Sequence, residues 1–477
     1  MRTLTLALVL ALLAACGPDK TPDATPVGQR DAIGDAGGAN TAVGDAGGAN
    51  TAVGANTAQP TPVAAEPKPG ALASTPPADE SPAAGQVLKA QQALNIQPDK
   101  PDLWAALGLA WIKKARADQD ERLYAQADDA SARALSLSPN HRQALVVKAM
   151  VLQQQHRFKG VREIARLVTA AEPRDTTAWG LLGDAALELG DYEAAEDAYQ
   201  HMIDLLPDIA SYSRVAWLRW IHGDVDGAAE MWDLALKITT TADPEPRAFC
   251  LSEMGHLEWH RGRLDDALRF YDAALTAMPQ HAPALFGRGR VHLAKGLHAE
   301  AVADLEASFK ARRLEETWTW LAHALRANGQ AARADQIEAR LADASDADDP
   351  RSVSLFLSTH KLNPARALAL ARKDAEDRGD LYTHDALAFA ALRAGLLDDA
   401  ARSSALAMAT NPPDPRLIAR AGLIDAARGQ RDQARARLQA ALDLNPAFDP
   451  TLAAEARAAL EALGPDKAPP IADGGQP

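Results

Sequence analysis

The sequence repeats itself over most of its length. From about residue 87 to residue 464, Ala- and Leu-rich segments with helical periodicity are interrupted by Gly and Pro at regular intervals. A single unit of this size cannot bury its apolar face alone, so consecutive units must stack on one another. The sequence therefore predicts an all-α array of stacked helix pairs. We align nine units, which begin near residues 101, 142, 176, 209, 248, 282, 315, 381 and 415.

Two positions in the aligned units hold small residues. Small side chains are needed where two helix axes approach closely, because a larger one would force the helices apart. In the first helix, all nine units have Gly or Ala at this position: Gly108, Ala149, Gly183, Ala216, Gly255, Gly289, Ala322, Ala388 and Gly422. In the second helix, eight of nine have Ala: Ala127, Val161, Ala195, Ala228, Ala267, Ala301, Ala334, Ala400 and Ala434.

The array has irregular parts at its ends and after the seventh unit. The first unit has about seven extra residues between its helices, near Lys113–Arg122. A degenerate helix pair is expected at roughly 352–361 and 364–378, and a lone helix at 83–97 precedes the first unit. Residues 450–463 are predicted to form the terminal cap helix that shields the apolar end of a repeat array.

The unit from residue 176 resembles the tetratricopeptide repeat, a 34-residue helix–turn–helix. The resemblance implies a right-handed superhelical solenoid over residues 87–464, with a concave surface lined by the first helices. It also implies an interaction scaffold for protein or peptide partners, and not an enzyme. The residues that carry the resemblance are Trp179, Leu182, Gly183, Gly190, Tyr192, Ala195, Tyr199 and Pro207.

The first fifteen residues have the pattern of a secretory signal peptide. Arg2 precedes an apolar run from Leu4 to Ala15, too short to span a bilayer comfortably. The ending Leu13-Ala14-Ala15-Cys16 resembles the bacterial lipobox, which implies cleavage before Cys16 and a lipid anchor on it. An ordinary signal peptide with an incidental cysteine is the alternative. Gly17 stands where inner-membrane lipoproteins have Asp, and by resemblance to Gram-negative lipoproteins this favours the outer membrane, facing the periplasm.

Residues 16–86 are predicted to be a disordered linker behind the lipidated cysteine. Residues 17–86 contain 11 Gly and 10 Pro, no aromatic residue, and an identical ten-residue duplication at 34–43 and 44–53. Such a composition cannot bury enough apolar surface to offset the entropy lost on ordering. The tail at 465–477 is also expected to be disordered.

Charge and motifs exclude several function classes. Asp and Glu (64) outnumber Lys and Arg (50), for a net charge of −14, which disfavours a nucleic-acid partner. Phosphate loops, nucleophile elbows and Cys-x-x-Cys pairs are absent from the sequence, so we expect no catalytic residue and no cofactor. His256 and His260 lie four apart on one helix, but without a third ligand at a helical interval we expect no metal. Cys250 is expected to be a small buried apolar residue.

The resemblance also implies which side chains line the groove of the solenoid. Exposed Trp and Arg are enriched in binding hot spots, so a partner-binding patch is predicted here. The alternative is that these aromatic residues pack between neighbouring first helices. A second function also stays open: an accessory subunit for envelope polysaccharide or peptidoglycan processing, with sugars stacked on the aromatic rings. The sequence does not predict the oligomeric state. The predicted patch consists of Trp217, Trp220, Phe249, His256, Trp259, Phe286, Arg290, His323 and Arg326.

Overall fold

The computed structural model describes residues 70–464, apart from 119, 242–243, 313–314 and 345–348. Within these residues every regular element is a helix, so the prediction of an all-α fold is confirmed. The signal peptide, Cys16, most of the linker and the tail at 465–477 lie outside the described residues. None of the helices in the described part is both long and apolar enough to cross a membrane.

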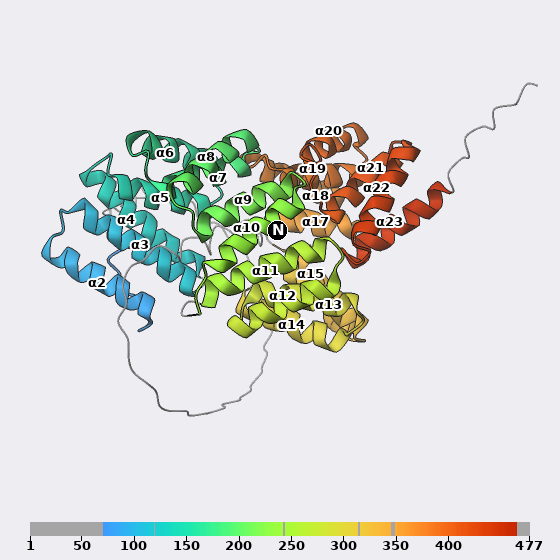
Figure 1. Ribbon diagram of the computed structural model, residues 1–477, viewed down its shortest axis with the longest axis horizontal. Helices are drawn as coiled ribbons and strands as arrows, with labels where there is room; N and C mark the ends of the chain where they lie inside the picture. The colour runs from blue at the N-terminus through green and yellow to red at the C-terminus, as the bar shows by residue number, and fades with distance from the viewer. Residues whose placement is uncertain (1–69, 119, 242–243, 313–314, 345–348, 465–477) are drawn as a thin grey trace, which may run out of the picture. The chain divides into compact units, whose positions relative to one another are not determined.

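The helices form ten consecutive antiparallel pairs, which we number repeats 1 to 10 (Figure 1). Helix α2 (Pro82–Ile96) precedes them, and α23 (Pro450–Leu463) follows them. The pairs are α3 (Pro101–Asp118) with α4 (Tyr124–Leu137), α5 (Arg142–Gln154) with α6 (Phe158–Ala171), α7 (Thr176–Glu188) with α8 (Tyr192–Leu205), α9 (Ile209–Ile221) with α10 (Val225–Lys237), α11 (Pro244–His260) with α12 (Leu264–Ala277), α13 (Ala282–Ala294) with α14 (His298–Ala311), α15 (Glu315–Ala327) with α16 (Ala331–Ala342), α17 (Pro350–Thr359) with α18 (Pro364–Asp377), α19 (Leu381–Arg393) with α20 (Leu397–Ala407), and α21 (Pro415–Ala427) with α22 (Arg431–Leu444).

Local sequence sets the ends of these helices. Asp residues cap many first helices; in repeat 3, the Asp175 carboxylate accepts a hydrogen bond from the Ala178 amide at 2.9 Å. The turn between the two helices of a repeat has a left-handed backbone in most repeats, and Gly190 holds it in repeat 3 with a φ of 77°. The degenerate pair predicted near 352–378 is occupied by α17 and α18, which make repeat 8.

The small residues lie at close helix contacts. A Cβ on Gly183 would overlap the ring of Tyr199, and a Cβ on Gly255 would overlap the ring of Tyr271. In both repeats the second helix places a tyrosine against the glycine of the first helix. Ala195 and Ala267, at the matching position of the second helix, are fully buried.

The end of the predicted linker is ordered, in contrast to the expectation. Residues 70–75 form a turn on repeat 1, where the Asp129 carboxylate accepts hydrogen bonds from the amides of Gly70 and Ala73. The indole of Trp111 donates to the Ala73 carbonyl at 2.9 Å. The prediction of disorder up to residue 86 is therefore wrong for residues 70–86. Composition alone missed that a segment without its own core can order against polar groups of a folded neighbour.

Candidate functional site

The structure brings most of the predicted patch together on the first helices of repeats 4 to 6. The rings of Trp217 and Trp220 on α9 stack with centroids 5.0 Å apart. The Arg290 guanidinium on α13 lies 4.8 Å from the ring centroid of Trp259 and 4.4 Å from that of Phe286. Trp320 on α15 completes the cluster, 5.9 Å from Trp259 between ring centroids. Trp320 was not among the residues predicted to line the groove.

The patch is buried, which corrects the expectation of an exposed binding surface. Seven of its members have relative exposures of only 1–7%: Trp217, Trp220, Phe249, His256, Trp259, Phe286 and Arg290. Trp259, Phe286 and Arg290 pack against one another and Trp320 between neighbouring first helices, and residues of α19 and α21 pack over Trp217 and Trp220. The Tyr382 ring on α19 stacks on Trp217 with centroids 6.2 Å apart. The alternative left open by the sequence, that these side chains are packing residues, describes this structure.

Arg326 lies away from the cluster around Arg290, whereas the His323 ring lies at its edge, 6.3 Å from Trp320 between ring centroids. His323 is half-buried, and its ring stacks on that of His360 in repeat 8, with centroids 6.2 Å apart. Arg326 is exposed and pairs with Asp335 and Glu338 on α16, at 2.9 and 2.8 Å. These pairs link the two helices of repeat 7, so Arg326 does not continue the patch.

Burial gives the patch unusual protonation states. His256 Nδ1 lies 2.7 Å from the Tyr271 hydroxyl and 3.1 Å from Arg290 Nη2, and burial lowers the pKa of His256 well below its usual value. Burial also raises the pKa of Glu253 to about 8 and lowers that of His260 to about 4. The interior of the patch therefore carries neutral histidines beside a cation. Among the described residues, we find no group of three or more potential metal ligands.

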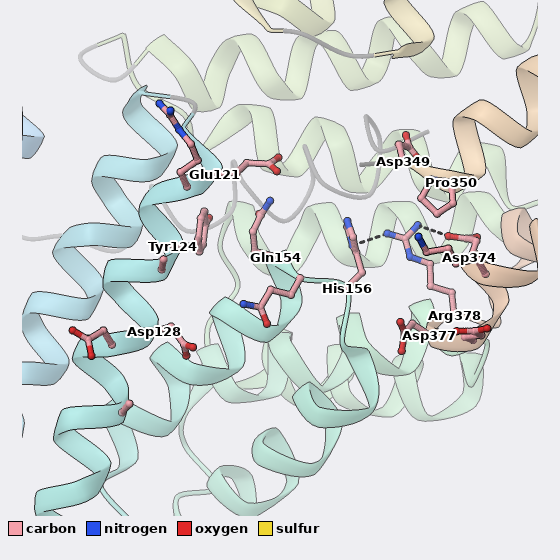
Figure 2. Close-up of a pocket in the computed structure, with 17 residues that line it drawn as sticks. Glu121, Tyr124, Asp128, Gln154, His156, Asp349, Pro350, Asp374, Asp377 and Arg378 are labelled. Carbon is pink, nitrogen blue, oxygen red and sulfur yellow. Dashed lines mark hydrogen bonds and ion pairs between the residues drawn. The ribbon is translucent and has the colours of Figure 1, made fainter. Parts of the chain in front are cut away.

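A separate, open pocket lies between distant repeats. Its volume is about 850 Å³, and its walls come from repeats 1 and 2 on one side and repeat 8 on the other (Figure 2). The sequence did not predict it, because its residues are brought together only by contact between repeats far apart in the chain. Its lining is mostly polar and acidic: Glu121, Arg122, Tyr124, Ala125, Asp128, Asp129, Ala132, Gln154, Gln155, His156, Asp349, Pro350, Lys373, Asp374, Glu376, Asp377 and Arg378.

Arg378 joins the two walls of this pocket. Its Nη2 lies 2.6 Å from His156 Nδ1 of repeat 2, and its Nη1 lies 3.6 Å from Asp374 of repeat 8 (Figure 2). Behind the pocket, Arg378 Nε lies 3.5 Å from the Glu188 carboxylate, whose pKa burial raises to about 7. Arg351 holds Asp374 from the other side at 2.8 Å. The ion pairs of Arg351, Asp374 and Arg378 thus hold this part of the pocket wall in place.

The rim of the pocket carries exposed negative charge. Glu121, from the short 3-10 helix Glu121–Leu123, and Glu376 and Asp377, from the end of α18, are exposed. The lining holds seven carboxylates against Arg122, Lys373 and Arg378. Such a cavity favours ligands with cationic groups, because opposite charge is stabilised where field lines focus in a cleft.

Two segments of the chain match a known repeat family. The tetratricopeptide-repeat family matches residues 148–208 and 252–315, which fall in repeats 2–3 and 5–6. No curated protein sequence matches this chain.

Three solved structures illustrate the similarity in fold. PilW, a widely conserved type IV pilus biogenesis factor, is 17% identical over 42% of this chain and 92% of its own, with a TM-score of 0.36. PilF of Pseudomonas aeruginosa is 10% identical over 43% of this chain and 92% of its own, with a TM-score of 0.37. The human IFIT1 dimer with PPP-AAAA is 13% identical over 76% of this chain and 89% of its own, with a TM-score of 0.42. Similarity this distant does not indicate what this chain binds. Residues 148–208 and 252–315 thus match the tetratricopeptide-repeat family, and the described residues form an all-α array of antiparallel helix pairs.

Proposed function

We propose that this protein is a lipid-anchored scaffold that holds a protein partner at the bacterial cell envelope. The observation that carries the proposal is the solenoid of tetratricopeptide repeats, an architecture whose extended surfaces serve in binding. An enzyme is disfavoured by the sequence, which has no phosphate loop, nucleophile elbow or Cys-x-x-Cys pair. The surfaces and pockets of the array are the places where another protein would bind.

The pocket between repeats 1, 2 and 8 is our candidate for the partner site. Its volume of about 850 Å³ accommodates several side chains of a peptide, and its rim carries the exposed carboxylates of Glu121, Glu376 and Asp377. We therefore expect the partner to present a segment with Lys or Arg side chains. The predicted patch is a weaker candidate, because seven of its nine side chains are buried.

The proposed location at the cell envelope rests on the N-terminal sequence. The apolar run ending in Leu13-Ala14-Ala15-Cys16 supports lipidation of Cys16, and Gly17 favours the outer membrane. Several acyl chains on one residue anchor a protein stably where one chain is marginal. Anchored in this way, the protein would present its repeats to the periplasm.

Lipid labelling tests the proposed lipid anchor on Cys16. The full chain, expressed in a bacterium that processes lipoproteins, should incorporate radiolabelled palmitate and sediment with membranes. Cys16→Ser should lose both properties, whereas Cys250→Ala, which changes the buried cysteine, should retain them. A Cys16→Ser protein that still carries label would remove the anchor from the proposal.

Photo-cross-linking tests the partner site. A photoreactive amino acid at Gln155, on the pocket wall, should cross-link the anchored protein to a discrete partner. The matched control is Gln200, an equally exposed glutamine on α8 that does not line the pocket. The same adduct from both positions, or none from Gln155, would exclude the pocket as the partner site.

The glycan-binding alternative has no support from the site. It depends on exposed aromatic rings that stack on sugars, and the clustered rings of the patch are buried. We therefore do not propose it.

A further inference from the structure

Three turns of the early repeats lie against three loops of the late repeats. The turn of repeat 3, at Gly190, lies against Gly379, in the loop after repeat 8. The turn of repeat 4, at Gly223, lies against Asn411 after repeat 9, and that of repeat 5, at Gly262, against Leu444 and Asn445 after repeat 10. The partners are five repeats apart in each case. This constant offset indicates that the repeats dock in register along their length.

Hydrogen bonds fix this docking at both ends. The Gly379 amide donates to the Glu188 carbonyl at 2.9 Å, and the Leu381 amide donates to the Tyr192 hydroxyl at 2.8 Å. At the other end, the Asn445 side-chain amide donates to the Trp259 carbonyl at 2.7 Å. The contacts use backbone groups and turns, so they join two arrays that are each complete helical stacks.

Side chains from the late repeats close over the predicted patch. Tyr382 stacks on Trp217, and Leu381 and Leu417 are buried in the same hydrophobic cluster as Trp217 and Trp220. On α11, His260 lies 5.1 Å from Trp220 between ring centroids, and its Nδ1 lies 4.0 Å from the Asp414 carboxylate of the loop before α21. The late repeats thus cover Trp217 and Trp220 of repeat 4.

Two polar groups buried at this contact lack hydrogen-bond partners within the described part of the chain. The Trp220 Nε1 and the Tyr382 hydroxyl, one from each side of the contact, are buried without a hydrogen-bond partner among the described residues. A buried polar atom without a partner loses its hydration free energy, and no hydrogen bond within the protein replaces it. Opening the contact would rehydrate both groups, which offsets part of the loss of apolar burial.

We propose that repeats 8 to 10 form an internal lid on repeats 3 to 5, and that opening this lid exposes Trp217 and Trp220 of repeat 4. The lid is closed in this structure. Repeat 8 belongs to the lid and also forms one wall of the pocket, so opening the lid would part the pocket walls; the test of the lid itself uses no partner.

Matched glycine variants test the lid. The lid variant is Gly190→Ala, Gly223→Ala and Gly262→Ala in the full-length chain, and the control is Gly296→Ala, Gly395→Ala and Gly429→Ala. All six glycines have φ between 70° and 81°, so alanine strains the backbone equally in both variants. A Cβ would meet the opposite loop at the first three positions, whereas at the last three it meets nothing within 4 Å.

The readouts are the radius of gyration from small-angle X-ray scattering and amide hydrogen exchange. We expect the lid variant to have a larger radius than the wild type, faster exchange at residues 379–381 and 444–447, and stronger fluorescence of added bis-ANS. The control should match the wild type in all three, and helix content should be equal in both variants. Equal radii and exchange rates in the lid and control variants would overturn the proposal.

A milder variant keeps the test decisive if the triple variant fails to fold. Tyr192→Phe removes only the hydroxyl that accepts from the Leu381 amide and leaves the backbone unchanged. We expect the Leu381 amide to exchange about tenfold faster at an unchanged melting temperature, since local opening exchanges amides without global unfolding. Exchange at the wild-type rate would show that the contact does not open locally, and would overturn the lid.

Discussion

The ring of Tyr199 on α8 lies across Gly183 on α7, where no side chain fits between the two helices of repeat 3. The same relationship recurs in repeat 5 between Tyr271 and Gly255. The Tyr199 hydroxyl then donates to the Asp184 carboxylate at 2.9 Å, so one tyrosine sets both the helix spacing and a buried polar contact. Repeat packing therefore depends on the glycine being kept.

Substitution of Gly183 should destabilise the array. Gly183→Ala is expected to reduce the free energy of unfolding by about 1–3 kcal/mol, because the added Cβ overlaps the Tyr199 ring, and Gly183→Leu should reduce it further. Gly85→Ala in α2 is the control, since a Cβ there meets nothing within 4 Å. It should raise stability by up to ~1 kcal/mol. Circular-dichroism melting that shows the same shift for both alanine variants would contradict the packing.

The Asp184 carboxylate is the centre of a buried network over three repeats. Besides the bond from the Tyr199 hydroxyl, it accepts two hydrogen bonds from Arg214, at 2.7 and 2.8 Å, and one from Gln153 at 3.1 Å. Asp184→Ala leaves the Arg214 charge buried without compensation, so we expect a loss of about 3–5 kcal/mol in urea denaturation. Glu306→Ala, which breaks an exposed pair with Arg333, should be nearly neutral. A loss below ~1 kcal/mol for Asp184→Ala would show that the network is not structural.

The repeats and their close contacts were predictable from sequence, and the burial of the patch was not. Gly183 and Ala195 mark a contact inside one repeat, where helix geometry fixes the neighbour from sequence spacing. The contact of Trp217 with Tyr382 joins repeats five apart, and it depends on how the solenoid turns over many units. The pocket at Arg378 has the same origin. Side-chain periodicity within a repeat contains no information on such distances.

Alanine substitutions in the predicted patch should reduce the stability of the fold. Trp259 is 1% exposed and in contact with Arg290 and Trp320, so Trp259→Ala should cost about 3–5 kcal/mol of folding free energy. Trp217→Ala and Arg290→Ala should also lower the melting temperature. Arg326→Ala, at an exposed position, should not. Acrylamide quenching measured as a single-Trp difference should find Trp259 protected; full quenching at unchanged stability would place it on the surface instead.

Glu253 should make stability fall as pH rises. Its pKa is about 8 in the folded chain, raised by burial with only a partial offset from the Arg290 charge, against an ordinary value of 4.5. Between these values the unfolded chain releases a proton that the folded chain keeps. The stabilisation is therefore complete below about pH 4.5 and lost as pH rises through about 8.

Removing this carboxylate should flatten the pH profile. Glu253→Gln is expected to be more stable than the wild type above about pH 7, by an amount on the order of a few kcal/mol. Glu306→Gln, at an exposed glutamate, should leave the wild-type profile unchanged. Urea denaturation at pH 5, 7 and 9 measures the difference. A Glu253→Gln profile parallel to that of the wild type would show that Glu253 ionises normally in the folded chain.

The most direct test of the scaffold is the affinity of the cross-linked partner for the full chain with and without the charge of the pocket rim. Glu376→Gln with Asp377→Asn removes two exposed carboxylates from the rim, and Glu196→Gln with Asp197→Asn removes an equivalent exposed pair from α8, away from the pocket. Surface plasmon resonance at low salt should give a dissociation constant about tenfold higher for the first variant, a change of about 1.4 kcal/mol. The second variant should bind as the wild type does. Equal affinities for the two variants would contradict a partner site in this pocket.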